Sequence, residues 1–378
     1  MRDKLLFTPG PLTTSATVKA AMQRDVGSRD AEFIALVRSI RERLLALAGV
    51  SREGGYETVL VQGSGTFGIE AVISTAIPRG GRLLALVNGA YGARIAAIAR
   101  AHGIALRVHE TAEDVAPAPA EIERVLAADP AITHVSVVQC ETTTGLMNHA
   151  EAIAEVAGRA GKSVLVDAMS AFGAVPLDLR RCGADFVVSS SNKCIEGVPG
   201  FSFVICRRQA LLAAEGQART LSLDLVAQWR GLEKDGQFRF TPPTHALLAF
   251  DRALLELDQE GGVAARARRY RANHQQLVDG MQRLGFRLFL PAAVQGYVIS
   301  SFRYPEQPAF RFEDFYARLS AKGFVIYPGK LTHAACFRIG NIGRIGAQEI
   351  DALLRAIAET LGELGVALPD EEAASRRR

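Results

Sequence analysis

The sequence predicts an α/β protein, with a large domain built on a mostly parallel sheet and a smaller α+β domain at the C-terminus. Short apolar runs alternate with stretches of helical spacing through the first half of the chain. These runs are continuously apolar, which is typical of parallel strands covered by helices on both faces. With 378 residues the chain exceeds one small core, which favours two domains.

The elements follow in chain order. Residues 5–11 contain two prolines and a glycine, so we expect an extended segment that crosses the surface of another part of the protein. Residues 18–48 show helical spacing with an interruption near Gly27. The expected strands of the large domain are 58–62, 82–87, 104–108, 132–138, 163–166, 184–188 and 201–206. The expected helices between them are 65–76, 91–102, 121–128 and 150–160.

The pattern changes after Thr241-Pro-Pro243, where two long helical stretches, 245–261 and 263–284, leave the sheet. The remainder mixes short strands with helices, which is typical of a smaller α+β domain. We therefore expect an extended segment 1–15, a large domain 16–255 and a small domain 256–378. The expected strands of the small domain are 287–290, 298–302 and 337–339, and its expected helices are 312–321 and 347–361.

Composition and charge exclude several classes of protein. The net charge is +4, from 44 basic and 40 acidic residues, and three of the positive charges are the terminal arginines 376–378, which we expect to be frayed. This near-neutral balance argues against nucleic-acid or membrane-surface partners. The sequence shows no secretory signal and no apolar run of membrane-spanning length. Five scattered cysteines without a CxxC pair indicate a reducing cytoplasm, and the histidine spacing predicts no metal site.

The most informative stretch is 187–200, which presents a single lysine, Lys193, in a polar turn directly after a buried strand. Gly197, Pro199 and Gly200 prevent a helix there, so Lys193 lies on a loop at the strand's carboxyl end. An earlier buried strand ends on Asp167. An amine and a carboxylate at neighbouring strand ends suit a cofactor held as a Schiff base, with the carboxylate beside a pyridine nitrogen. We therefore infer pyridoxal phosphate as the cofactor.

Each of these residues also has an ordinary structural interpretation. Asp167 could be a helix N-cap, and Lys193 a solvated loop lysine. The loop Gln62-Gly-Ser-Gly-Thr66 suits a phosphate, because it precedes a helix and offers hydroxyl and N–H donors, but an ordinary strand-to-helix turn is equally consistent. Tyr91 could cover a flat cofactor or staple a helix start, and Arg338 could bind an anionic substrate or form a buried ion pair.

The order of these features resembles a known family, the 2-aminoethylphosphonate–pyruvate aminotransferases within class V, over essentially the full chain. This family has the type I pyridoxal-phosphate fold. The resemblance rests on distinctive strings: Val87-Asn-Gly-Ala-Tyr-Gly-Ala-Arg94, Glu141-Thr-Thr-Thr-Gly145, Val166-Asp-Ala-Met-Ser170, Asn192-Lys-Cys-Ile-Glu-Gly-Val-Pro-Gly-Phe201, Phe324-Val-Ile-Tyr-Pro-Gly-Lys330 and Cys336-Phe-Arg-Ile-Gly-Asn-Ile-Gly343.

The resemblance implies a role for each candidate residue. Lys193 would form the Schiff base with the cofactor, and Asp167 would pair with its pyridine nitrogen. Arg338 would bind the acidic end of the substrate. The remaining implied cofactor contacts are Ser64, Gly65 and Thr66 to the phosphate, Tyr91 stacked on the ring, Thr142 near the 3-hydroxyl, Met169 and Asn192 around it, and Thr241 to the phosphate of a neighbouring subunit. The last contact implies a homodimer with shared active sites.

The implied reaction transfers the amino group of 2-aminoethylphosphonate to pyruvate, giving phosphonoacetaldehyde and L-alanine by a ping-pong scheme. The alternative within the same class is a serine– or alanine–glyoxylate aminotransferase. A desulfurase would need a mobile cysteine, whereas Cys336 lies in an apolar strand. A cofactor-free doubly wound binding protein would explain the sheet, but it would not explain the pairing of Asp167 with Lys193.

Overall fold

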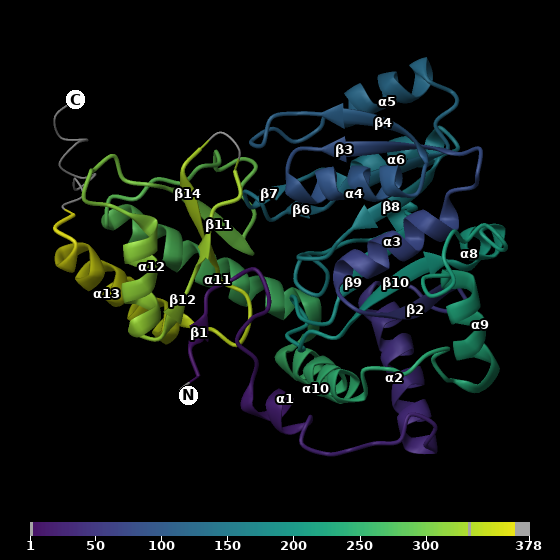
Figure 1. Ribbon diagram of the computed structural model, residues 1–378, viewed down its shortest axis with the longest axis horizontal. Coiled ribbons are helices and arrows are strands. Elements are labelled where there is room, and N and C mark those ends of the chain that lie inside the picture. Colours follow the sequence, from purple (N-terminus) through teal and green to yellow (C-terminus); the bar gives the residue numbers. More distant parts are fainter. Residues whose placement is uncertain (1–2, 332–333, 367–378) are drawn as a thin grey trace.

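The computed structural model describes residues 3–331 and 334–366, so the terminal arginines 376–378 lie outside the described residues. The chain forms a large part around a seven-stranded sheet and a smaller part beside it (Figure 1). Within the described ranges, no helix combines the length and the apolar character needed to cross a membrane.

The seven-stranded sheet organises the large part. Its order is β2-β10-β9-β8-β5-β3-β4, and β10 is antiparallel to both neighbours while the other pairs are parallel. Every residue of β9 is buried, which requires cover on both faces of the sheet. The strands are β2 (Tyr56–Gln62), β3 (Arg82–Val87), β4 (Ala105–Glu110), β5 (His134–Val138), β8 (Ser163–Asp167), β9 (Phe186–Ser190) and β10 (Phe201–Arg207).

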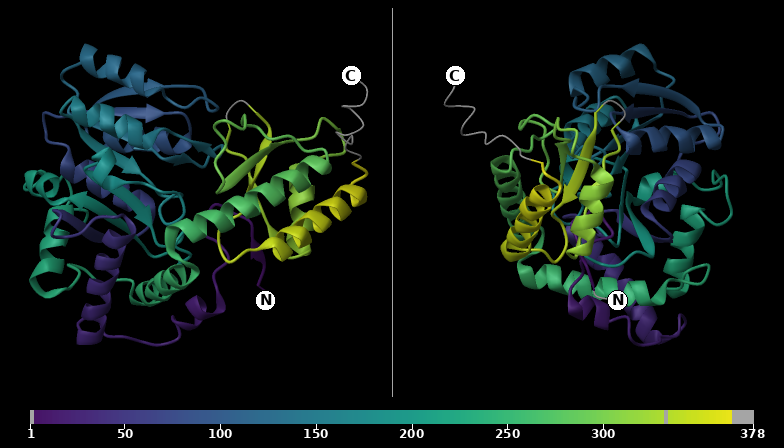
Figure 2. Two further views of the ribbon diagram at one scale, coloured as in Figure 1. Left: turned by 180° about the vertical axis from the view of Figure 1, so that it is seen from behind. Right: turned by 60° about the vertical axis from the view of Figure 1, so that its left-hand side comes forward.

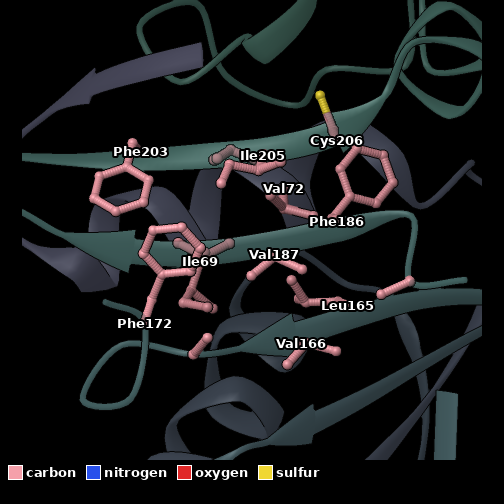
Figure 3. Packing of buried hydrophobic residues seen from close by; sticks show 14 of the residues in the cluster. Ile69, Val72, Leu165, Val166, Phe172, Phe186, Val187, Phe203, Ile205 and Cys206 are labelled. Carbon is pink, nitrogen blue, oxygen red and sulfur yellow. The ribbon is translucent and has the colours of Figure 1, made fainter. Parts of the chain in front are cut away.

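Helices cover this sheet, and their apolar sides complete the large core. Ile69 and Val72 pack against Phe186, Val187 and Ile205 of the sheet (Figure 3). The helices are α1 (Ala16–Ala20), α2 (Ala31–Leu47), α3 (Gly65–Ala76), α4 (Ala90–Ala101), α5 (Pro119–Ala128), α6 (Ala150–Arg159), α7 (Leu179–Cys182), α8 (Arg208–Ala213), α9 (Leu225–Asp235) and α10 (Thr244–Glu260). A short antiparallel ribbon of β6 (Cys140–Glu141) and β7 (Leu146–Met147) lies beyond the sheet.

The small part has its own core, rich in phenylalanine. A three-stranded sheet of β11 (Ile299–Arg303), β14 (Cys336–Gly340) and β13 (Tyr327–Pro328) packs with α12 (Phe312–Ala321) and α13 (Ala347–Glu363). The buried rings are Phe286, Phe302, Phe310, Phe315 and Phe337. The long helix α11 (Gly262–Arg283) runs from the large part into this core (Figure 2).

The N-terminal segment is extended, as expected, but much of it is buried. β1 (Leu5–Leu6) pairs in parallel with β12 (Phe324–Val325) of the small part. Phe7, which follows, is fully buried in the small core. The segment therefore passes between the two parts and does not simply cross a surface.

Most expected elements of the large domain are present with ends shifted by one or two residues, and helix 65–76 agrees at both ends. The expected strand 287–290 is wrong. Leu288 forms only an isolated bridge with Phe302, because Pro291 ends the run before a ladder develops. The separate cores of the two parts fit domains 16–255 and 256–378, although these boundaries stay predictions.

Candidate active site

The sheet brings Asp167 and Lys193 to one edge. Asp167 is the last residue of β8, and Lys193 lies in the turn after β9. The two strands are parallel neighbours, with Asp167 paired to Val188, so both chains leave the sheet on the same side. Both residues line one cavity of about 250 Å³ at this edge.

Most of the residues predicted from the sequence share this cavity. The exceptions are Thr142, Thr241 and Arg338, which do not line it. The predicted residues in its wall are Ser64, Gly65, Thr66, Tyr91, Asp167, Met169, Asn192 and Lys193. Residues that the sequence did not indicate also line it, namely Gly10, Ile69, Arg94, Ile95 and Ser190.

The start of α3 is prepared for an anion. Ser64 is the N-cap residue, but its side chain makes no capping hydrogen bond, whereas Ser15 at the start of α1 does accept one. The Ser64 hydroxyl and the first N–H groups of α3 thus remain available to a phosphate. A Cβ atom at Gly65 would collide with Met169, so the glycine lets this side chain close the cavity.

Arg94 adds a cation to the same cup. Its Nη1 donates to Thr66 Oγ1 at 3.2 Å, and its guanidinium lies 5.0 Å from the ring centroid of Tyr91. The sequence analysis missed this residue. The signal was available, since Arg94 follows Tyr91 by three positions and therefore lies on the same helix face.

Asp167 combines its structural and functional interpretations. Its Oδ1 accepts a hydrogen bond from the Met169 N–H at 2.9 Å, which is the local cap that the sequence allows. Burial raises the pKa of Asp167 to about 6, and the charge of Glu141 adds to this effect. A cation beside the carboxylate would lower this pKa again and would be stabilised in return.

Lys193 does not project into solvent. Its Nζ donates to the Pro9 carbonyl at 2.7 Å, and burial lowers the pKa of this amine. The neutral form is therefore closer to neutral pH than in an exposed lysine. The sequence analysis missed the contribution of the N-terminal segment. Gly10, at φ +104°, would place a Cβ only 2.8 Å from Lys193 Cδ, so a larger residue does not fit.

Arg338 lies beside Tyr91 on β14 and is fully buried. Its Nη1 donates to the Thr142 carbonyl at 2.8 Å, and its Nε donates to the Pro328 carbonyl at 3.0 Å. No carboxylate in the described part of the chain forms an ion pair with it, which argues against the structural ion pair. Its charge is thus available to an anionic ligand.

Tyr91 joins these groups electrostatically. Burial raises the pKa of its phenol, but the hydrogen bond with Thr142 and the charges of Lys193, Lys330 and Arg338 together lower the pKa below its usual value. The ring also lies 5.6 Å from Lys330 Nζ. Tyr91 therefore has a fixed hydroxyl in addition to a flat face.

Glu141 is a second residue that the sequence analysis missed. Its carboxylate accepts from the N–H groups of Tyr91 and Gly92, both at 3.2 Å, and from that of Thr143 at 3.1 Å. Burial raises the pKa of this carboxyl. By joining the start of α4 to the turn at Thr142, Glu141 fixes both walls around Tyr91. A glutamate directly after a buried strand was the available signal.

Thr241 lies apart from the cavity. It is exposed, and its carbonyl accepts from Gln62 Nε2 at 2.8 Å. Its hydroxyl is therefore free to face a neighbouring molecule.

Comparison with known proteins supports this site. Residues 13–326 match the model of the family described as aminotransferase class-V. The chain belongs to the class-V aminotransferases. A relative in Pseudomonas entomophila, named 2-aminoethylphosphonate–pyruvate transaminase, is 47% identical over 362 residues, covering 96% of this chain and 98% of its own. A chain of the same name in Vibrio cholerae is 50% identical over 359 residues, covering 94% and 97%.

The fold is that of type I pyridoxal-phosphate aminotransferases. The solved alanine–glyoxylate aminotransferase from Nostoc sp. superposes with a TM-score of 0.88 at 25% identity, covering 96% of both chains. Class-V aminotransferases use pyridoxal phosphate, and the cavity fits this cofactor. It offers an uncapped helix start for a phosphate, a buried carboxylate and an enclosed amine.

Proposed function

We propose that this class-V aminotransferase moves the amino group of 2-aminoethylphosphonate to pyruvate, giving phosphonoacetaldehyde and L-alanine. The observation that carries the chemistry is the meeting of Lys193, Asp167 and the uncapped start of α3 in one cavity. The substrate pair is supported by relatives of that name at 47–51% identity over nearly the whole chain.

The cavity residues would divide the binding of pyridoxal phosphate among them. Ser64, Gly65, Thr66 and Arg94 would hold the phosphate, since they join a helix start to a guanidinium. Asp167 would hold the ring nitrogen in its protonated form, and Thr142 would bond near the 3-hydroxyl. Tyr91 would cover one face of the ring, with Met169 and Asn192 around it. When bound, the cofactor supplies an aldehyde that exchanges amines and a ring that withdraws electrons.

Lys193 would move the proton that transamination requires. Because burial lowers its pKa, the amine can accept a proton from the substrate carbon and return it one position away. Arg338 would orient the acidic end of both substrates, as its guanidinium lacks a carboxylate partner among the described residues. Phosphonoacetaldehyde leaves before pyruvate is converted to L-alanine, which makes the scheme ping-pong.

We also propose a homodimer in which Thr241 reaches the partner's phosphate. The exposed Thr241 lies next to Phe240, and Arg239 links this segment to Leu221 through its carbonyl. Three exposed apolar side chains occur in this region and beside the phosphate cup, namely Phe67, Leu221 and Phe240. A second copy would cover them. A reducing, cytoplasmic setting is supported by five cysteines that are all free and buried.

A panel of amino donors with pyruvate as acceptor tests the substrate. We expect 2-aminoethylphosphonate to exceed serine and alanine by orders of magnitude in kcat/KM. A preference for serine or alanine with glyoxylate would establish the alternative, which the Nostoc structure represents. Lys193→Ala separates the chemistry from the substrate question, because this variant should lose turnover with every donor.

A further inference from the structure

Glu196, three residues after Lys193, has an unusual backbone and an unusual side-chain position. Its φ is +69°, and it is the one non-glycine residue with positive φ in the described ranges. Side chains on L-residues rarely adopt this conformation, so something in the fold must impose it. Its N–H donates to the Lys193 carbonyl at 2.8 Å, which closes the turn that presents the lysine.

The Glu196 carboxylate is buried and has partners on α11 only. Its Oε1 accepts from the Tyr270 hydroxyl at 2.5 Å and from Arg269 Nη2 at 2.7 Å. Arg266 Nη1 lies 3.4 Å from the same oxygen and donates to the Cys194 carbonyl at 2.6 Å. The lysine turn is thus fixed to α11 through both its backbone and this side chain.

The same α11 side chains continue to the small part. Arg269 Nη1 donates to the Gly343 carbonyl at 2.7 Å, and the Tyr270 hydroxyl accepts from the Gly343 N–H at 3.0 Å. Gly343 lies just beyond β14, the strand that holds Arg338. One network therefore joins the lysine turn to the strand of the proposed substrate arginine.

The network returns to the amine through the N-terminal segment. The Arg344 N–H donates to the Thr13 carbonyl at 2.7 Å, and the Gly340 N–H donates to the Phe7 carbonyl at 3.0 Å. Between these two points of attachment lies Pro9, whose carbonyl accepts from Lys193 Nζ. Both ends of the lysine, its backbone and its amine, are thereby positioned by contacts that meet at residues 340–344.

We propose that Glu196 is a positioning residue, which sets Lys193 relative to Arg338 by linking the lysine turn to the small domain through α11. This inference rests on the proposed function, in which Lys193 is the reacting amine. The simpler interpretation is that Glu196 only neutralises Arg266 and Arg269. That interpretation leaves its positive φ and the link to Gly343 unexplained, since a carboxylate on α11 itself would neutralise them equally well.

A matched pair of variants separates the two interpretations. Glu57, on β2 at the opposite edge of the sheet, is also a buried carboxylate among arginines, with Arg208 at 2.8 Å and Arg41 at 3.5 Å. Glu196→Gln and Glu57→Gln each remove one buried charge of this kind, and both should lower the thermal stability of the holoenzyme. Only Glu196→Gln should alter the lysine.

The measurements are kcat, KM for each substrate and the pH midpoint of the visible cofactor absorbance, which depends on how Lys193 meets the cofactor. We expect Glu196→Gln to lower kcat about 10- to 100-fold and to shift the midpoint by about half a unit or more. Glu57→Gln should change kcat by less than about twofold and leave the midpoint in place. If both variants lose stability alone, Glu196 is structural and the inference is overturned.

Tyr270→Phe provides a second route should Glu196→Gln fail to fold. This variant deletes the hydroxyl between Glu196 and Gly343 without removing a charge. A smaller midpoint shift in the same kind of measurement supports the inference, and an unchanged midpoint and kcat contradict it. Lys193→Ala is the separate check on the proposed function. If that variant keeps its absorbance and turnover, the choice of lysine is wrong, whatever the other variants show.

Discussion

The contact between the N-terminal segment and Lys193 makes a specific prediction for Gly10→Ala. Gly10 has φ +104°, and a Cβ there would lie 2.8 Å from Lys193 Cδ and 2.9 Å from the Asn192 carbonyl oxygen. Gly103 offers a matched control, since it also has a positive φ, +64°, but a Cβ there meets nothing within 4 Å. Any difference between the two alanine variants thus measures the contact with the lysine.

The two variants differ in the size of the expected effect. The left-handed backbone alone costs an alanine about 1–2 kcal/mol, and Gly103→Ala should lose no more than this. Relaxing a 2.8 Å contact to an ordinary carbon separation moves the lysine or the segment by roughly 1 Å. Overpacking of this kind adds about 1–3 kcal/mol, and a displacement of that size at a reacting group costs about 100-fold in rate.

Urea unfolding of the apo forms and steady-state transamination by the holo forms measure these two quantities. Gly10→Ala should lose about 2–4 kcal/mol of unfolding free energy and 10- to 100-fold in kcat, whereas Gly103→Ala should keep wild-type kcat. If Gly10→Ala were destabilised like its control and retained full kcat, the segment would not position Lys193.

Three further predictions concern the cofactor, the substrate and the dimer. The pKa of Asp167 is raised by burial from 3.8 to about 6, so apo stability is lost as pH rises through that range. Asp167→Asn should therefore stabilise the apo protein at pH 7 by up to about 3 kcal/mol in urea unfolding, yet lower holo turnover at least about 100-fold; equal apo stabilities would contradict this. Arg338→Lys should raise KM for pyruvate about 10- to 100-fold with the cofactor spectrum intact, because a lysine cannot reproduce the forked donors, and an unchanged KM would exclude the assigned role. Leu221→Asp should convert a dimer to a monomer in sedimentation, and Val115→Asp, an exposed apolar site elsewhere, should not; a wild-type profile for Leu221→Asp would place the interface on another face.

The sequence predicted the sheet well because its signals are local. The strands around Val187 and Val166 are continuously apolar, and the glycine, proline and serine residues between them mark the turns. The adjacent strand ends at Asp167 and Lys193 follow from that pattern once the sheet is parallel. The run at 287–290 misled the prediction, since two leucines in a short segment do not reveal that Pro291 follows without a ladder.

The rest of the site depends on contacts between distant residues. The Pro9 carbonyl meets Lys193 across 184 positions, and no local pattern encodes such a pairing. Arg338 was recognisable as a costly charge in an apolar strand, but its lack of a carboxylate partner became visible only from the packing around it. Glu141 and Arg94 had local signals that were overlooked, since both adjoin residues already selected.

The central claim is that Lys193 is the amine that binds the cofactor. Borohydride reduction of the holoenzyme makes this bond permanent, and mass spectrometry of a digest then locates it. We expect the added mass on the peptide that contains Lys193 and on no other. Label on Lys330, which lies near the opposite side of Tyr91, or on any other lysine, would contradict the account.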